Sequence, residues 1–381
     1  MGHIAAPRRG KIADMDTFLD AAEQLLAIQS TADNPRGLAH ALEFVLDFTG
    51  PGFTVERFVS AGKPSALLYT GTSRPSFRVI LNGHLDVVPA TADQFRPRRD
   101  GGHLYARGAQ DMKVSALGLA LVFRELAPRL PYPLGLQVVT DEEHGGRDGT
   151  LHQLLNDVTA SFAIIGESSG LDVVTESKGI VAVTLEATGR TAHSAYQWLG
   201  DNALVSLHAT LTNVMEKYPV ATAEQWRTIV SLVRIETPNT ARNQIPDTAR
   251  AWLDIRYPHS DGDFTGRSAA DIGEYLQSMC APGVTAMVER LDAPHHASQS
   301  DHDVLALRDA ARGQCERAGV VGGEFLRKHG AGDGRFYGER GIPAVAFGVG
   351  GGGQHGPDEF ADMSTIQPYL AALRSFLTGI S

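Results

Sequence analysis

The stretch VILNGHLDVVPA, residues 79–90, places a histidine and an aspartate two positions apart at the end of an apolar run. A continuous apolar run of this kind is typical of a strand in a sheet that is covered on both faces. His84 and Asp86 stand at its end, and for one such pair a satisfied polar turn is the ordinary interpretation. The other segments of the chain decide whether a functional interpretation is better.

Short apolar runs of the same kind recur along the chain, and each is followed by polar residues. They are FRVILNGH, LGLQVVTDEE, FAIIGE and PAVAFGVGGGGQH. Helical patterns lie between or beside them, such as MDTFLDAAEQLLAIQS and KVSALGLALVFREL. Apolar strands that alternate with helices predict the α/β class, with a mostly parallel sheet between layers of helices.

The middle of the chain has a different pattern. Its runs IVAVTLEATG, WRTIVSLVRIET and TARAWLDIRYP alternate apolar and polar residues, which is typical of strands with one exposed face. Helical patterns near 202–218 and 264–279 interrupt these runs. We therefore predict a smaller α+β domain with an antiparallel sheet at 179–290, inserted into a larger domain formed by residues 1–178 and 291–381.

Composition and charge exclude several classes of protein. Apolar residues make up 43% of the chain and charged residues 20%, which is normal for a globular protein. The net charge of -10 disfavours nucleic acid and anionic membranes as partners, because both need clustered lysine and arginine. Cys280 and Cys315 form no CxxC pattern, so a cysteine-based zinc site is excluded. Without a signal-peptide pattern or an apolar run of about 20 residues, a cytoplasmic protein is expected.

Histidines and carboxylates follow the apolar runs or open the next helix, on five separate segments. They are His84 with Asp86, Asp111, Asp141 with Glu142 and Glu143, Glu167, and His355. Because ligands of open α/β sheets bind at the carboxyl ends of the strands, we expect these side chains to meet. Carboxylates gathered in one place repel one another unless cations neutralise them. Two imidazoles and three carboxylates suit a pair of Zn²⁺ ions, although Co²⁺ or Mn²⁺ would accept the same ligands.

Together these motifs resemble the zinc-dependent amidohydrolase and metallopeptidase family of acetylornithine deacetylase, succinyl-diaminopimelate desuccinylase, aminoacylase and carboxypeptidase G. The matching segments are GHLDVVP, YARGAQDMK, TDEEHGG, IIGES and HGPDEF, and they follow the family's order across nearly the whole chain. The resemblance implies a catalytic, metal-binding larger domain and an inserted lid and dimerisation domain.

The resemblance also implies the metal ligands. Asp111 would bridge two zinc ions, and a cis peptide bond would follow it. His84 and Glu167 would complete the shell of one ion, and Glu143 and His355 that of the other.

Two further residues of these motifs would act without binding metal. Asp86 would accept a hydrogen bond from the distal nitrogen of His84 and fix its tautomer. Glu142 would be the general base, which takes a proton from the attacking water and later gives it to the leaving amine.

The inserted domain would supply groups that contact the substrate. The segment GRTAHSAYQWLGDNAL resembles the family segment whose histidine supports the oxyanion, which implies this role for His193. In dimeric members that histidine reaches the partner's active site, and a homodimer is expected. The segment ARNQIPDTARAWLDIRYP implies that Asn243 and Arg256 hold the substrate carboxylate. In the loop GAGDGRF, Asp333 and Arg335 would orient the substrate.

We therefore predict a dinuclear-zinc hydrolase that cleaves the amide bond of an N-acyl amino acid, a small molecule with a free carboxylate. It would be of the deacylase, deacetylase or desuccinylase type. The acyl group stays open, because Ser177-Lys178 stands where desuccinylases have two arginines and Ala331 where many relatives have threonine. The alternatives are a carboxypeptidase-like or dipeptidase-like peptidase of the same family and a non-catalytic relative that acts as a binding protein. Glu167, where dipeptidases tend to have aspartate, disfavours a dipeptidase, and an intact Glu142 favours an enzyme.

Overall fold

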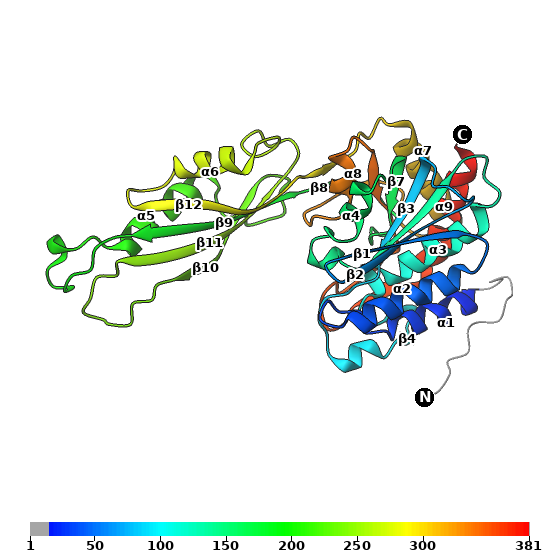
Figure 1. Ribbon diagram of the computed structural model, residues 1–381, viewed down its shortest axis with the longest axis horizontal. Coiled ribbons are helices and arrows are strands. Elements are labelled where there is room, and N and C mark those ends of the chain that lie inside the picture. The colour runs from blue at the N-terminus through cyan, green and yellow to red at the C-terminus, as the bar shows by residue number, and fades with distance from the viewer. Residues whose placement is uncertain (1–14, 381) are drawn as a thin grey trace. The chain divides into compact units, whose positions relative to one another are not determined.

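The apolar run at 79–90 forms β3, Phe77–His84, near the middle of the larger sheet. The structure, a computed structural model, describes residues 15–380. Within these residues the sheet has nine strands in the order β1-β2-β6-β3-β7-β15-β8-β13, with β14 paired to β8 (Figure 1). The other strands are β1 Thr54–Ser60, β2 Lys63–Tyr69, β6 Leu134–Val139, β7 Ala160–Ile165, β8 Val173–Ser177, β13 His295–His296, β14 Phe325–Lys328 and β15 Ala344–Ala346.

The centre of this sheet is parallel. Strand β3 pairs in parallel with β6 on one side and β7 on the other, and β7 pairs in parallel with β15. In this register His84 lies opposite Val139, and Asn82 lies opposite Ile165. The predicted α/β class with a mostly parallel sheet is confirmed. Because these four neighbouring strands run in one direction, their carboxyl ends meet at one edge.

Helices cover both faces of the sheet, which explains why β3 shows no alternation of apolar and polar residues. Val79 and Leu81 join the core formed with α1, α2, α3, α7 and α9, whereas Ile80 joins the core on the other face with α4 and α8. The helices are α1 Met15–Leu26, α2 Pro35–Thr49, α3 Val114–Leu126, α4 Thr150–Leu155, α7 His302–Ala318, α8 Gly334–Gly338 and α9 Ile366–Gly379.

The chain divides into two compact units. The larger unit comprises the chain up to Thr175, His296–Arg327 and the chain from Gly332 on, and the smaller unit comprises Glu176–His295 with Lys328–Ala331. The smaller unit thus begins and ends a few residues outside the range predicted for the inserted domain, and it also takes a short segment from near the C-terminal end.

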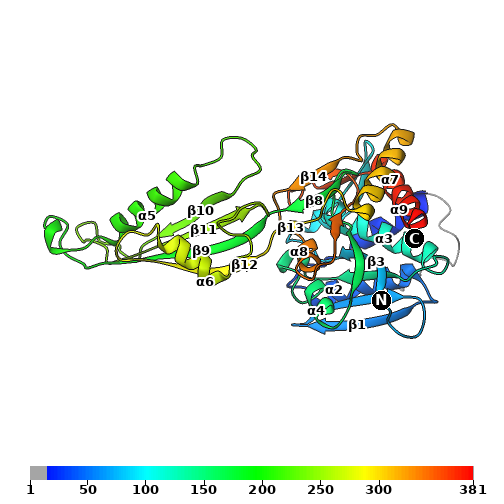
Figure 2. The same cartoon turned by 90° about the horizontal axis from the view of Figure 1, so that it is seen from above.

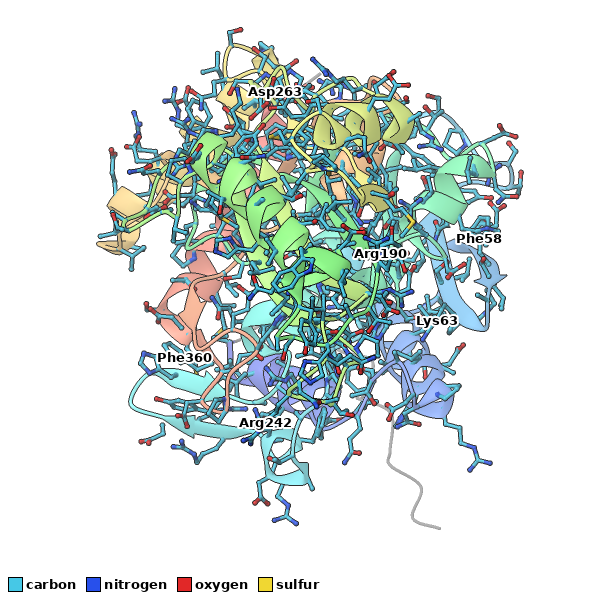
Figure 3. The ribbon with its side chains drawn as sticks, turned by 90° about the vertical axis from the view of Figure 1, so that its left-hand side faces the viewer. Phe58, Lys63, Arg190, Arg242, Asp263 and Phe360 are labelled. Carbon is cyan, nitrogen blue, oxygen red and sulfur yellow. The ribbon has the colours of Figure 1, made fainter. Side chains whose placement is uncertain are left out.

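The smaller unit contains an antiparallel sheet with helices on one face. Its strands follow the order β10-β11-β9-β12, and α5 and α6 pack on the same face (Figures 1 and 2). Val181, Val183 and Leu185 of β9 point to these helices, as the alternating pattern predicts. Asp263, labelled in Figure 3, accepts hydrogen bonds from Tyr218 and Tyr275 and so joins the two helices. The elements are β9 Gly179–Thr188, α5 Ala203–Lys217, β10 Ile229–Glu236, β11 Thr248–Tyr257, α6 Ala269–Gln277 and β12 Val284–Asp292.

A small additional sheet completes the larger unit. Its strand order is β16-β17-β5-β4. The strands are β4 Arg98–Asp100, β5 His103–Tyr105, β16 Gly351–Gly352 and β17 Phe360–Asp362. Across residues 15–380, no helix has the length and apolar character needed to cross a membrane.

Candidate metal centre

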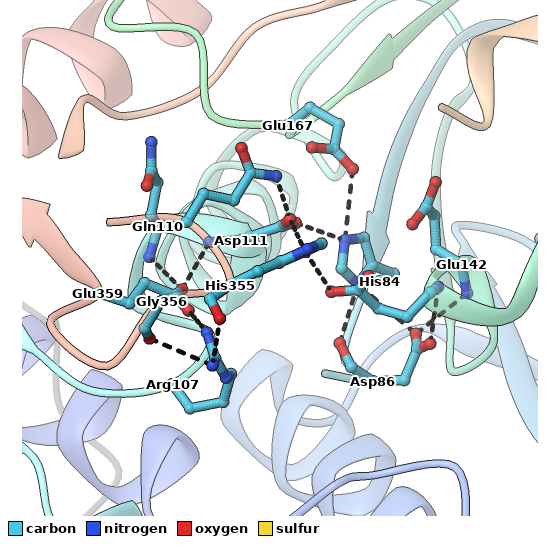
Figure 4. A network of polar contacts seen from close by, with 12 residues as sticks. His84, Asp86, Arg107, Gln110, Asp111, Glu142, Glu167, His355, Gly356 and Glu359 are labelled. Atoms are coloured by element: carbon cyan, nitrogen blue, oxygen red, sulfur yellow. Dashed lines mark hydrogen bonds and ion pairs between the residues drawn. The ribbon is translucent and has the colours of Figure 1, made fainter. Parts of the chain in front are cut away.

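The candidate ligands come from the ends of neighbouring strands and from two turns, all in the larger unit. His84 ends β3, Glu167 follows β7, and Glu143 lies in a short 3-10 turn after β6. Asp111 lies in the turn Ala109–Lys113, directly before α3, and His355 lies between β16 and β17. Figure 4 shows that the side chains of these segments converge on Asp111.

The candidate ligands form two groups that share Asp111. In the first group, His84 Nε2 lies 3.0 Å from Asp111 Oδ1 and 3.3 Å from Glu167 Oε1. In the second, His355 Nε2 lies 3.2 Å from Asp111 Oδ2 and 3.3 Å from Glu143 Oε1. The candidate ligand atoms of each group all lie within 4.8 Å of one another. One carboxylate thus presents a different oxygen to each group, which is the arrangement of a bridging ligand.

The backbone around Asp111 has an unusual geometry that the family resemblance predicted. The peptide bond between Asp111 and Met112 is cis, so this prediction is confirmed. On the strand side, Gly83 allows α3 to approach β3, because a Cβ at this position would lie 2.9 Å from the Cβ of Ala116. The first turns of α3, which directly follow the turn that carries Asp111, therefore pack closely against the strand that carries His84.

Asp86 holds two parts of the site at once. Its Oδ1 accepts a hydrogen bond from the backbone N–H of Glu142 at 3.1 Å, and its Oδ2 accepts one from Glu143 at 3.0 Å. His84 Nδ1 lies 3.0 Å from the carbonyl oxygen of Asp86 and 3.5 Å from its carboxylate. The nearer acceptor for the imidazole is thus the backbone of Asp86, whereas its carboxylate mainly fixes the turn of the two glutamates.

The electrostatics of the two groups suit a bound cation. Burial opposes protonation of His84, but its contacts with Asp111, Asp86 and Glu167 outweigh burial and raise its pKa well above the usual range. Burial, with the charge of Asp111 added, raises the pKa of Glu143 to about 7. The shift of the His84 pKa shows that the surrounding carboxylates favour positive charge at the centre of the cluster. A divalent cation would supply that charge and would leave the carboxylates ionised and the imidazoles neutral, as ligands must be.

Glu142 stands beside these groups without belonging to either within residues 15–380. Burial raises its pKa well above the usual range, and the nearby charge of Glu167 adds to the rise. The charges of the candidate ligands therefore influence the pKa of the Glu142 carboxylate, although this carboxylate is not itself one of the candidate ligands.

The side chains of Asp333 and Arg335 form hydrogen bonds with other residues of the larger unit. Both side chains are at most 2% exposed. Thr150 donates a hydrogen bond to Asp333, and Arg335 donates to the carbonyl oxygens of Gly332 and Gly145, both at 2.7 Å. Gly145 directly follows the turn of the two glutamates, so Arg335 supports that turn. Their predicted contact with substrate stays a prediction.

Two of the three candidate residues of the smaller unit, His193 and Asn243, lie on adjoining segments, and Arg256 lies near the far end of β11. His193 forms a β-bridge with Gln244, the neighbour of Asn243, and both candidates are exposed. Arg256 Nε donates to Asp254 Oδ1 at 2.6 Å on β11, and this side chain is about one-third exposed. A substrate carboxylate would have to share or replace that ion pair. The roles of these three residues stay predictions.

Sequence reasoning missed two buried charged residues, Arg107 and Glu359. Glu359 accepts a hydrogen bond from the backbone N–H of Asp111 at 3.2 Å, and Arg107 pairs with Glu359 (Figure 4). Both belong to segments that the motifs contain, YARGAQDMK and HGPDEF. Their only signal in the sequence is this position beside candidate ligands.

Comparisons with a family profile, with curated proteins and with solved structures all find peptidases or related hydrolases. The sequence profile of the peptidase family M20/M25/M40 matches residues 80–379. A putative succinyl-diaminopimelate desuccinylase DapE of Mycobacterium tuberculosis is 30% identical over 375 residues, which cover 95% of this chain and 98% of that protein. A probable carboxypeptidase of Aspergillus clavatus is 30% identical over 269 residues, 64% of this chain and 63% of that protein. The crystal structure of an M20 family metallo-carboxypeptidase from Sulfolobus solfataricus has a TM-score of 0.74 at 17% identity, covering 96% of this chain and 99% of that one.

Proposed function

Because the chain belongs to peptidase family M20/M25/M40 and is therefore a hydrolase of amide bonds, we propose that it cleaves the amide of an N-acyl amino acid with a pair of metal ions. One observation carries this proposal. Asp111 presents Oδ1 to the group of His84 and Oδ2 to the group of His355, so a single carboxylate can serve two ions.

The proposed ions are two Zn²⁺, with Co²⁺ or Mn²⁺ as metals of the same ligand preference. His84, Asp111 and Glu167 would hold one ion, and Asp111, Glu143 and His355 the other. The chemistry that such a pair supplies when bound is that of a Lewis acid, which polarises a carbonyl group and makes water easier to deprotonate.

Glu142 is the proposed general base. The hydrogen bond from its backbone N–H to Asp86 fixes its position, while its side chain remains outside both candidate ligand groups. Its carboxylate would take the proton of the attacking water and pass it to the leaving amine. Asp86 is a positioning residue in this proposal, because it holds the turn of Glu142 and Glu143 and contacts His84.

The proposed substrate is a small molecule with a free carboxylate. Arg256 would bind that carboxylate, since the guanidinium fork suits two carboxylate oxygens. Asn243 lies at the opposite end of β11, beside His193, so it would reach the same carboxylate from the partner subunit of a dimer. His193 would donate to the oxyanion that forms when water adds to the amide carbonyl. Similarity to a probable carboxypeptidase of Aspergillus clavatus favours a second candidate function, a carboxypeptidase, which needs the same free carboxylate.

Hydrolysis of a substrate panel tests the proposal. We expect the protein loaded with Zn²⁺ to hydrolyse an N-acetyl or N-succinyl amino acid, and a chelator to remove this activity until metal returns. The matched control is the same N-acyl amino acid with its α-carboxylate converted to an amide, which should be a much poorer substrate. Faster cleavage of dipeptides would favour the carboxypeptidase. No turnover of any substrate by the fully metallated protein would contradict both candidates.

We propose that the protein is a homodimer that associates through the smaller unit. Strand β10 lies at the edge of its sheet, and its side chains Leu232, Val233 and Ile235 are 42%, 61% and 51% exposed. Apolar side chains gathered on an edge strand mark an interface. We expect Val233→Lys to convert the dimer to a monomer in sedimentation equilibrium. The control is Val59→Lys on β1, an edge residue of the larger sheet that is 67% exposed. A wild-type monomer, or equal effects of both substitutions, would refute this interface.

A further inference from the structure

A buried ion pair between Arg107 and Glu359 lies beside the two candidate metal groups (Figure 4). We propose that this pair is a positioning clamp, which fixes the turn that carries Asp111 relative to the loop that carries His355. The inference rests on the metal-binding part of the proposed function and goes beyond the ligands themselves. We call Arg107 and Glu359 the clamp below.

Glu359 holds the first of the two segments. Its side chain is 2% exposed, and its Oε1 accepts hydrogen bonds from the backbone N–H groups of Gln110 at 3.1 Å and Asp111 at 3.2 Å. Its own carbonyl accepts a third from Ala106 at 3.1 Å. One carboxylate oxygen therefore fixes the backbone at the shared candidate ligand, where a small rotation would turn Asp111 away from one of the two groups.

Arg107 holds the second segment. It is 3% exposed, and its Nη2 donates to the carbonyl oxygens of His355 at 2.9 Å and Gly356 at 3.2 Å. His355 needs such support, because its φ of 61° places a residue other than glycine in the left-handed region. Gln94 Nε2 adds a bond to the Gly356 carbonyl at 2.9 Å. The guanidinium thus holds the carbonyl of a strained candidate ligand.

The clamp joins two ligands that are 244 positions apart in the chain. The continuous path runs from the Asp111 N–H through Glu359 and Arg107 to the His355 carbonyl. Each end of this path is the backbone of a candidate ligand, and the Oδ2 of Asp111 lies 3.2 Å from His355 Nε2. Groups that orient metal ligands change metal affinity when they are removed, by about 10–100-fold. The second group, which includes both residues, depends most directly on the clamp.

The test measures metal affinity. In Glu359→Gln the side-chain oxygen still accepts from Asp111, but the charge that pairs with Arg107 is lost. We expect about 10–100-fold weaker binding of one Zn²⁺ in competition with a chromophoric chelator. We also expect a lower kcat at saturating substrate with an unchanged KM. Arg107→Lys keeps the charge but cannot reach both carbonyls and Glu359 together, so its expected loss is similar.

The control is Asp303→Asn, which breaks the bidentate ion pair of Arg78 and Asp303 elsewhere in the larger unit. It should lower stability without changing Zn²⁺ affinity. If Glu359→Gln does not fold, Arg107→Lys carries the test. Folded variants that bind Zn²⁺ as tightly as the wild type refute the clamp.

The clamp and the proposed function can fail separately. If the wild type binds metal but hydrolyses nothing, the proposed reaction fails, whereas the affinities still decide the clamp. If the wild type binds no metal, amide hydrogen exchange decides it. The N–H groups of Gln110 and Asp111 should then exchange faster in Glu359→Gln than in the wild type, because a neutral amide oxygen accepts more weakly than a carboxylate, and equal exchange rates refute the clamp.

Discussion

Replacing Glu142 with glutamine is expected to lower kcat by about 10²–10⁴-fold while both metal ions stay bound. Glutamine keeps the size of the side chain but cannot accept the proton of the attacking water. Because Glu142 belongs to neither candidate ligand group within residues 15–380, metal content should not change. KM should change little, since the substrate carboxylate is proposed to bind elsewhere. Steady-state kinetics on the best panel substrate, with metal analysis of the same samples, measures all three quantities.

The adjacent glutamate provides the matched control. Glu143 lies one position further along and its carboxylate lies 3.3 Å from His355 Nε2, so Glu143→Gln should lose metal as well as activity. The two variants differ by one position and remove the same charge. If Glu142→Gln also loses metal, Glu142 is a ligand. If it keeps full activity, another residue is the base.

The architecture of the larger unit and the place of its candidate ligands were predictable because they rest on local patterns. An apolar run without alternation predicts a strand covered on both faces, and β3 is such a strand. Parallel strands share the direction of their carboxyl ends, so polar residues after β3, β6 and β7 had to meet at one edge. His84 and Glu167 do so with their contacting atoms 3.3 Å apart. The predicted family and the predicted class of amide hydrolase are confirmed on the same basis.

Long-range packing was not predictable, because no local pattern encodes it. Charged residues are normally exposed, and nothing in YARGAQDMK or HGPDEF indicates that Arg107 and Glu359 are buried together. For the same reason, nothing in GAGDGRF indicates that Asp333 bonds to Thr150 or that Arg335 bonds to the carbonyl of Gly145, and their predicted contact with substrate stays a prediction. The segment Lys328–Ala331 joins the smaller unit through contacts that a linear reading of the chain cannot reveal.

Replacing Asp111 with asparagine is expected to remove both metal ions and all measurable hydrolysis. Asparagine has the same shape but only one oxygen and no charge, so it cannot bridge two cations. The effect should be visible without any substrate. At a metal concentration of 100 times Kd, each bound ion stabilises the wild type against unfolding by about 2.7 kcal/mol, and this gain should vanish in the variant. Each protein is compared with its own metal-free form, so any change that the substitution makes to the metal-free fold cancels.

Glu167→Gln separates a shared ligand from an unshared one. Glu167 contacts only the group of His84 among the two groups in residues 15–380, so its loss should release one ion and leave the group of Glu143 and His355 able to bind. Two ions lost in Asp111→Asn and one in Glu167→Gln would make Asp111 the bridge. If Asp111→Asn loses only one ion, Asp111 is a ligand in a single group and its second oxygen does not bind metal. If Asp111→Asn keeps both ions and full activity, the shared carboxylate is not what holds the metal pair, and the observation that carries the proposed function fails.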